Sequence, residues 1–592
     1  MQTIAHLTKD KDIQKLITVA QGKQSADLAV VNARLLNVYT GEILDNQTIC
    51  TCGPWIAYVG ENPGESIGSV TKVVDAAGKT VIPGLIDGHA HLAWMATPDE
   101  FLKHIMTGGT TTIVTEVLEA YPIAGLQGTI ELIESLQNQP IKCLCTAPAM
   151  VSISHKAREM SLDDLNALLD RGDVLGLGES YWQGLLQEPD IILPRFKAAL
   201  QSGKLLEGHS AGASEKKLNA YIAAGISSCH EPIKAHEVLE RLRLGLHVMA
   251  REGSIRRDLQ DIAKIQATGA ELRRLILVTD GVHPLELLEK GYMEFVVQKA
   301  IDYGFNPVAA IQMATLNVAE HFNLDQVIGG IAPGRLADMV VIPDIETIKA
   351  DTVISNGIII AENSTVCVPP RPHPWTHDVL NSVHMPEPAS ASDFRVKAAI
   401  ENGEAVVRAI DLVTDLVTAS KEVSLKIVGS EICANVAQDI IKVAAIDRTH
   451  QPGKTFTGFL KGFHLQSGAF ACSASWDASA IIVAGTTDED MAAAVNWIRD
   501  MQGGAVVVDQ GEVAAELAMP ILGLSALLPI EDIVERLQNI QTALKERGVV
   551  FPDPLLTLIT LTGAAIPFIR ISEEGLVNLK NGQKEELVVE LK

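Results

Sequence analysis

Basic residues, cysteines and long apolar runs are all scarce in this chain, and each shortage excludes a class of protein. Its 48 lysines and arginines stand against 73 aspartates and glutamates, for a net charge of −25. That charge argues against a nucleic acid or an anionic membrane as the main partner. Eight cysteines in 592 residues are too few for a disulfide scaffold. No apolar run precedes Lys9 and Asp10, so we expect no secretory signal and a cytoplasmic protein.

The apolar residues that are present indicate a large folded protein rather than a membrane protein. The late apolar stretch 554–569 falls short of the ~20 residues that a membrane-spanning helix needs. Hydrophobic residues still make up 47% of the chain, which excludes disorder as its main state. At ~100–200 residues per domain, the length implies several domains or one large barrel with additions.

Between residues 83 and 330, short apolar runs rich in β-branched residues alternate with helical segments. This alternation is typical of βα units around a parallel sheet, and eight such runs predict a (β/α)8 barrel. The helix starts are well marked, because Thr97-Pro98-Asp99-Glu100 is a capping box and Ser161 precedes an amphipathic helix. The predicted strands are 81–89, 110–116, 141–148, 174–179, 204–209, 225–230, 247–252 and 275–280.

The segments on either side of the barrel have strand composition. Residues 1–82 contain a short helix and then strands, and residues 331–367 return to strand-like sequence after the barrel at 83–330. The proline-rich start of residues 368–394 indicates a linker, and residues 395–592 have the pattern of another α/β region. The predicted fold class is α/β, with a (β/α)8 barrel, a small β-sandwich built from both flanks and an additional C-terminal α/β domain.

The strongest local signal is a pair of histidines at the end of the first predicted barrel strand, in Pro83-Gly84-Leu85-Ile86-Asp87-Gly88-His89-Ala90-His91. Side chains alternate along a strand, so His89 and His91 point the same way. At the carboxyl end of a barrel strand, both can reach one metal ion. A lone His-x-His is a weak signal, but this context makes it a candidate metal site.

Four more polar side chains end later predicted strands, and they are Glu179, His209, His230 and Asp280. Catalytic groups of barrel enzymes come from this end of the strands. Any one of them alone is most simply a structural polar residue. Taken with the two histidines, they predict a metal-dependent barrel, because six strand-end residues would otherwise have to imitate one coordination set by chance.

These residues and the motifs around them resemble the adenine deaminase family of the amidohydrolase superfamily over nearly the full length. The C-terminal region is similar to that family's own extra domain. The motifs that carry the resemblance are the strand-end His-x-His, Gly109-Thr110-Thr111-Thr112, Arg251-Glu252-Gly253-Ser254 and the segments 218–228, 313–317, 331–338, 485–491 and 520–524.

The resemblance implies a site with two divalent metal ions at the barrel mouth. Family members of this kind work with manganese, iron or zinc, and mixed histidine and carboxylate ligands suit each of these metals. In the implied site, His89 and His91 bind one ion, His209 and His230 bind the other, Glu179 bridges them, and Asp280 contacts a metal and the attacking hydroxide.

The implied reaction is hydrolytic deamination of adenine or a related purine-like base, with release of ammonia. Metal coordination lowers the pKa of water from ~15.7 towards ~7, and Asp280 accepts a proton from that water and orients it. A second acid must then protonate a ring nitrogen or the departing amine. Glu119 and Glu231 are the candidates, and each also has a plain interpretation as a glutamate that follows a strand.

The pattern departs from the family around the substrate and not at the implied ligands. The chain has Ala93-Trp94-Met95 for Glu-Ser-Ser, Glu116-Val117-Leu118-Glu119 for Asp-Pro-His-Glu, Asp280-Gly281-Val282-His283 for Asp-Asp-Arg-His, and Trp476-Asp477-Ala478 for His-Asp-Ser. We therefore expect a more apolar pocket. Its predicted substrate-binding residues are Trp94, Met95, Leu118, Tyr181 and His283, although the aromatic rings could equally well pack the barrel rim.

Two other functions stay open at this point. The same site could open a lactam or imide ring as a cyclic amidohydrolase, without releasing ammonia. The chain could also be a non-catalytic scaffold of the amidohydrolase type, although such a scaffold usually loses metal ligands and all six are present here. The expected partners are a small heterocyclic substrate and further copies of the chain in a homo-oligomer, with no nucleic acid and no membrane.

Overall fold

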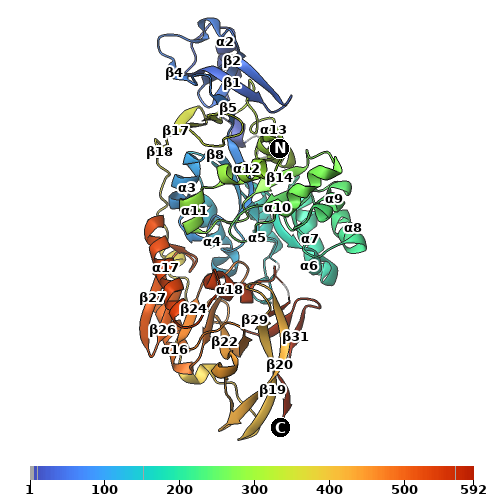
Figure 1. Cartoon of the computed structure of the whole chain (residues 1–592), viewed down its shortest axis with the longest axis vertical. Coiled ribbons are helices and arrows are strands. Elements are labelled where there is room, and N and C mark those ends of the chain that lie inside the picture. Colours follow the sequence, from blue (N-terminus) through green and yellow to red (C-terminus); the bar gives the residue numbers. More distant parts are fainter. Residues whose placement is uncertain (1–5, 10, 151, 567) are drawn as a thin grey trace.

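The computed structural model describes residues 6–9, 11–150, 152–566 and 568–592, so most of the segment 1–10 considered for a secretory signal lies outside the described residues. Three parts follow one another along the long axis of the molecule (Figure 1). A sheet formed by the two flanks lies at one end, the barrel lies in the middle, and the C-terminal domain lies at the other end. This architecture confirms the predicted fold class.

The barrel consists of two parallel sheets that meet at two seams. Along the first seam the Ser227 N–H donates to the Leu206 carbonyl (2.9 Å), and along the second the Asp280 N–H donates to the His89 carbonyl (3.0 Å). These bonds join the sheets into one ring. The strand order is β6 (Leu85–Ala90), β8 (Thr110–Glu116), β9 (Lys142–Ala147), β10 (Val174–Tyr181) and β11 (Leu205–His209) in the first sheet, and β12 (Ser228–Cys229), β13 (His247–Arg251) and β14 (Leu275–Val278) in the second.

The first predicted strand, 81–89, is divided in the structure. Its start forms β5 (Thr80–Pro83), which pairs antiparallel with β15 (Met339–Ile342) outside the barrel, and its end forms β6. The break falls at Gly84, where an added Cβ would lie 2.1 Å from Thr111 Oγ1. Only glycine therefore lets the chain pass so close to the neighbouring strand as it leaves one sheet for the other.

Helices surround the barrel strands, and their starts follow the predicted caps. The Thr97 side chain accepts a hydrogen bond from the Glu100 N–H, and Ser161 accepts one from the Asp164 N–H. The helices are α3 (Pro98–Thr107), α4 (Tyr121–Ser135), α5 (Leu162–Leu169), α6 (Trp182–Gln187), α7 (Pro189–Gln201), α8 (Glu215–Ala223), α9 (Ala235–Arg243), α10 (Leu259–Ile262), α11 (Pro284–Lys290), α12 (Met293–Asp302), α13 (Pro307–Met313) and α14 (Leu316–His321).

Both flanks of the barrel contribute to one nine-stranded sheet. The pairing of β5 with β15 joins the two flanks, and residues from both share one buried apolar cluster. The remaining strands are β1 (Leu28–Asn37), β2 (Glu42–Cys52), β3 (Trp55–Gly60), β4 (Lys72–Asp75), β16 (Thr352–Ser355), β17 (Ile358–Glu362) and β18 (Thr365–Val366), and the helix α2 (Ile13–Ala20) precedes them.

The C-terminal domain is built on a ten-stranded sheet and a separate three-stranded sheet. The large sheet contains β19 (Gly403–Leu412), β20 (Thr418–Val428), β21 (Glu431–Ile432), β22 (Ile440–Asp447), β23 (Thr455–Lys461), β24 (Ala469–Cys472), β25 (Ala480–Gly485), β26 (Gly504–Asp509), β27 (Glu512–Ala518) and β32 (Val588–Leu591). The small sheet contains β29 (Ile569–Ser572), β30 (Gly575–Asn578) and β31 (Gln583–Glu585), and the main helices are α16 (Asp488–Asp500), α17 (Ile530–Glu546) and α18 (Pro554–Ile559).

The C-terminal domain contacts the barrel at several places, and two of them are close to the barrel mouth or its linker. The segment predicted as a linker lies against the barrel, where the Arg371 side chain donates to the carbonyls of Gln137 and Glu134. The short strand β7 (Met95–Ala96), which follows the histidine pair after a short loop, runs parallel to β28 (Ser525–Ala526) of the domain. These contacts hold the domain over the carboxyl ends of the barrel strands. The domain boundaries themselves stay a prediction.

The apolar stretch that begins at Pro554 forms α18 and is buried in the domain. None of the helices among the described residues is both long enough and apolar enough to span a membrane. Four cysteines on barrel and flank strands are also core residues. Cys50 and Cys52 on β2 and Cys143 and Cys145 on β9 are buried free thiols. A buried free thiol of this kind packs as a small apolar side chain.

Candidate metal centre

Glu179 lies at the centre of the strand-end residues that the sequence singles out. Its Oε1 atom is 3.2 Å from His89 Nε2, 3.3 Å from His91 Nε2 and 3.4 Å from His230 Nε2. Its Oε2 atom is 3.5 Å from His209 Nδ1. One carboxylate on β10 therefore faces all four imidazoles, because the parallel strands all end at the same mouth of the barrel.

Asp280 follows β14 and completes the group from the other side of the ring. Its Oδ1 atom lies 3.1 Å from His89 Nε2 and 3.6 Å from His91 Nε2, while Arg251 donates to Oδ2 at 3.1 Å. The residue has a φ of +64°, in the left-handed region that few residues other than glycine, asparagine and aspartate adopt. The bond from its N–H to the His89 carbonyl holds it in this conformation.

Glu231 and His230 form a second group with His209. Glu231 Oε1 lies 3.3 Å from His230 Nε2 and 3.6 Å from His209 Nδ1, and Arg251 donates to the same oxygen. The His230 ring also stacks on His89 at a centroid distance of 4.2 Å. His230 therefore contacts both groups.

The charges of the site decide which carboxyl groups stay ionised. Burial alone would raise the pKa of Asp280 and of Glu231. Contacts with His89 and His91 and the charge of Arg251 outweigh burial and hold the pKa of Asp280 well below its usual value. Arg251, followed by His209, likewise lowers the pKa of Glu231. Both carboxylates are therefore available as anions at neutral pH.

His209 provides a test of whether these residues fit a metal ion. The residue is buried, and neither of its ring nitrogens has a hydrogen-bond partner among the described residues. A buried imidazole without partners costs free energy unless a ligand satisfies it. Divalent cations accept this mixture of imidazole and carboxylate donors. The potential ligand atoms form two groups, and within each group all atoms lie within 4.8 Å of one another. One group is His89, Glu179, His230 and Asp280, and the other is His209, His230 and Glu231.

Two further glutamates lie directly behind the potential ligands. Glu119 is completely buried, and its Oε1 atom lies 2.6 Å from His91 Nδ1, which fixes the ring so that Nε2 faces Glu179. Glu116, at the end of β8, accepts a hydrogen bond from the Glu179 N–H (3.1 Å). Burial raises the pKa of Glu116 to about 8. Both side chains therefore orient other members of the site.

A cavity of about 380 Å³ opens directly above these groups. The barrel contributes Leu118 and Tyr181 to its wall, and both are among the residues predicted to bind the substrate. The Tyr181 hydroxyl donates to Glu179 Oε2 at 3.4 Å. The C-terminal domain supplies the opposite wall. Its lining residues are Leu416, Val417, Trp476, Asp477, Gly563, Ala565 and Ile566.

The other predicted substrate-binding residues lie outside this lining. The Trp94 ring stacks on Trp476 (centroid distance 4.9 Å), so it supports the cavity wall from behind. Met95 is buried in β7, where it pairs with the C-terminal domain. His283 caps α11 and lines a neighbouring hollow between the barrel and the domain. Their contact with a substrate stays a prediction.

Three residues of the site were not among the sequence candidates. Glu116 could have been found, because it ends a predicted strand in the same way as Glu179. Arg251 ends β13 but belongs to a motif that the resemblance supplied without a role. Asp477 belongs to the motif Trp476-Asp477-Ala478, but nothing in the sequence placed that motif at the barrel mouth, because it lies in a separate domain far along the chain from the barrel strands.

Comparisons with known proteins cover almost the whole chain. The amidohydrolase family model matches residues 80–406, and the model of the adenine deaminase C-terminal domain matches residues 415–583.

An adenine deaminase of Clostridium botulinum (strain 657 / Type Ba4) is 32% identical over 586 residues, which are 97% of each chain. An adenine deaminase of Moorella thermoacetica is 33% identical over 97% of this chain and 98% of its own. Among solved structures, a β-aspartyl dipeptidase of Fervidobacterium islandicum is 16% identical with a TM-score of 0.46, over 58% of this chain and 98% of its own.

The two family models divide the site between them. The first covers every barrel residue of the ligand cluster, and the second covers the domain that forms the opposite wall of the cavity. The relatives are similar over both parts at once. The chain therefore belongs to the adenine deaminase family of the amidohydrolases and is a hydrolase that acts on C–N bonds.

Proposed function

We propose that the chain is a metal-dependent hydrolytic deaminase that converts adenine or a related purine-like base and releases ammonia. The observation that carries this proposal is the position of Glu179, whose carboxylate faces four buried imidazoles below the cavity. The cavity has the size of a small-molecule site and mostly apolar walls, which suit a flat heterocycle. The two adenine deaminases of similar length support the choice of base.

The proposal includes two divalent ions, of manganese, iron or zinc. His89 and His91 would hold one and His209 and His230 the other, with Glu179 between them and Asp280 beside the first. When bound, such ions act as Lewis acids and lower the pKa of water from ~15.7 towards ~7. The nitrogen and oxygen donors suit all three metals.

Asp280 and Glu231 divide the proton transfers between them. Arg251 donates to one oxygen of each, so the two carboxylates lie side by side at the cavity floor. Asp280 Oδ1 accepts one proton of the attacking water and returns it to a ring nitrogen. Glu231, which is an anion before the reaction, takes up the other proton of the water and passes it to the departing amine. Glu119 does not line the cavity, so its part is to orient His91. The loss of ammonia then needs no proton donor from bulk water.

The direct test combines metal analysis with a substrate screen. The purified chain is loaded with manganese, iron or zinc, and adenine, other purines, pterins and cyclic imides are offered while ammonia and ring absorbance are recorded together. Ammonia release from adenine or another purine supports the proposal. Ring opening without ammonia would establish a cyclic amidohydrolase instead, and a metal-loaded chain that turns over no compound would favour a binding scaffold.

The location and assembly of the protein complete the proposal. We place it in the reducing cytoplasm, which agrees with eight free cysteines. We expect a homo-oligomer, a dimer or larger, that binds no nucleic acid because of its charge of −25. Light scattering coupled to size-exclusion chromatography measures the oligomeric state, and a DNA-binding assay at physiological salt measures nucleic-acid binding.

A further inference from the structure

Asp477 is a buried carboxyl group of the C-terminal domain that lines the cavity of the barrel. Only 3% of the residue is exposed. Its Oδ2 atom accepts a hydrogen bond from the Ala564 N–H at 2.9 Å, which fixes the carboxyl plane. Its Oδ1 atom is buried and has no hydrogen-bond partner among the described residues.

An unpaired oxygen of this kind is destabilising unless something else satisfies it. Leaving a buried acceptor without a partner costs free energy that replacement by an apolar residue would avoid. Burial also disfavours the charged form of this carboxyl group and raises the pKa of Asp477 to about 7. Such a group is typical of a site whose missing partner is a ligand.

The other carboxylates of the cavity are already engaged. Glu179 faces the four histidines, while Asp280 and Glu231 both accept from Arg251. Asp477 lies on the wall that the C-terminal domain provides, next to Trp476. Among the described residues of the cavity lining, it is therefore a buried acidic group with one oxygen free to accept a hydrogen bond from a substrate.

The wall that carries Asp477 is held in place from the barrel side. Trp476 stacks on Trp94 at a centroid distance of 4.9 Å and an angle of 12° between the ring planes. The Asp477 carboxyl is fixed through Ala564, in the segment that follows α18. Both anchors position the carboxyl before any substrate enters, so little conformational entropy is lost when it binds.

We propose that Asp477 is a substrate-binding residue, and that its Oδ1 atom accepts a hydrogen bond from a ring N–H on the edge of the purine-like base remote from the metal centre. This inference rests on the proposed function. In adenine the amine and the imidazole N–H lie at opposite ends of the ring system, so one end reaches the metal centre and the other reaches Asp477. A base that carries a methyl group or a sugar on that nitrogen has no such N–H. Asp477 therefore selects free bases over N-substituted ones.

The experiment compares the metal-loaded full chain with its D477A and D477N variants on adenine and on 9-methyladenine. Asp490→Asn is the matched control, because Asp490 is a buried aspartate of the same domain that bonds the Gly511 N–H away from the cavity. We expect D477A and D477N to raise the KM for adenine by about 10- to 100-fold, the usual value of a hydrogen bond to a charged group. The preference for adenine over 9-methyladenine falls by a similar factor, while D490N keeps both values.

Calorimetric binding of adenine separates this inference from the proposed function. A wild-type chain that binds adenine without releasing ammonia refutes the function, whereas weaker binding by D477N still supports the role of Asp477. D477N has the shape of the natural side chain, so its near-ultraviolet circular dichroism and metal content show whether the fold is intact if D477A is unstable. Folded variants that bind adenine and discriminate against 9-methyladenine as the wild type does would overturn the inference, and so would a wild-type chain that binds no free base.

Discussion

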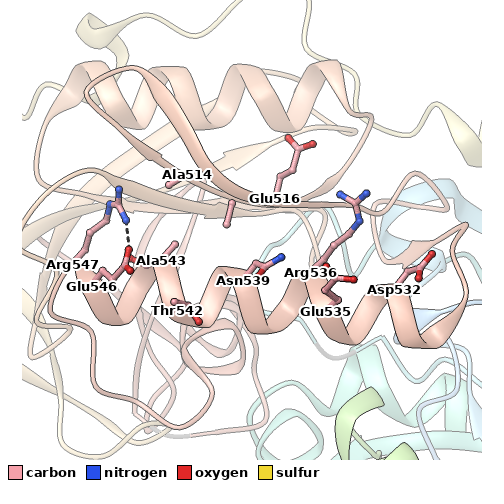
Figure 2. A pocket seen from close by; sticks show the side chains of 11 residues that line it. Ala514, Glu516, Asp532, Glu535, Arg536, Asn539, Thr542, Ala543, Glu546 and Arg547 are labelled. Carbon is pink, nitrogen blue, oxygen red and sulfur yellow. Dashed lines mark hydrogen bonds between the residues drawn. The ribbon is translucent and has the colours of Figure 1, made fainter.

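Two hollows of this molecule differ in size and in what their polar groups do. The larger one, about 680 Å³, lies between α17 and the edge strand β27 of the C-terminal domain (Figure 2). The smaller one, about 380 Å³, lies at the mouth of the barrel. Volume alone would select the first, whereas the chemistry selects the second.

The groove on the C-terminal domain is lined by polar side chains that are already satisfied. Asp532, Glu535 and Arg536 on α17 are exposed to water, which solvates their charges at little cost. Arg547 donates to Asp509 at 3.0 Å and to the Ala543 carbonyl at 2.9 Å. In the barrel, by contrast, the side chains are buried and several of their atoms have no hydrogen-bond partner among the described residues. Buried polar groups without partners mark a site better than an open volume does.

The sharpest test of this comparison is to remove one carboxylate from each hollow. Glu179→Gln should abolish tight metal binding and lower kcat/KM on the order of 10³-fold or more, because the carboxylate that faces all four histidines is lost. Metal analysis by mass spectrometry and ammonia release measure the two effects. An E179Q variant that keeps its metal and its activity would show that the buried cluster is structural.

Asp280→Asn should reduce kcat by about 10²- to 10⁴-fold and leave most of the bound metal in place. The reason is that Asp280 accepts the proton of the attacking water, while Glu179 and the histidines retain the ions. Steady-state kinetics on the metal-loaded variant, with the metal content measured on the same sample, distinguish this result from that of E179Q. Equal metal loss in both variants would make Asp280 a ligand only.

Glu119→Gln should weaken metal binding by about 10- to 100-fold, since the hydrogen bond at 2.6 Å orients His91 and raises its basicity. The isosteric amide retains one polar contact, so the fold is expected to survive. Competition with a metal chelator measures the affinity. A variant with unchanged affinity but no activity would instead return Glu119 to the role of a catalytic acid.

Glu535→Gln is the control from the groove and should have the smallest effect. Its side chain is exposed on α17, so the free energy of unfolding should change by no more than about 0.5 kcal/mol, with kcat/KM unchanged. Urea denaturation and ammonia release check both values. A marked loss of activity would show that the larger hollow takes part in the reaction and would break the comparison.

Much of the barrel site could be predicted because the rules involved are local. His89 and His91 share a face through the two-residue period of a strand, and Glu179, His209, His230 and Asp280 each end an apolar run. The same rule would have found Glu116. Trp94 and Met95 were harder to interpret, because an aromatic or apolar residue at a strand end fits a substrate wall and a packing interface equally well. In the structure they meet Trp476 and β28.

The sequence by itself determined the order of the strands, the residues at their ends and the family of the chain, since these depend on spacing along a single segment. Only the tertiary structure decided that one arginine, Arg251, joins Asp280 to Glu231, and that Asp477 closes the cavity from a distant domain. Such contacts join segments far apart in the chain, and they depend on how whole layers pack against each other. No local pattern of residues encodes that packing.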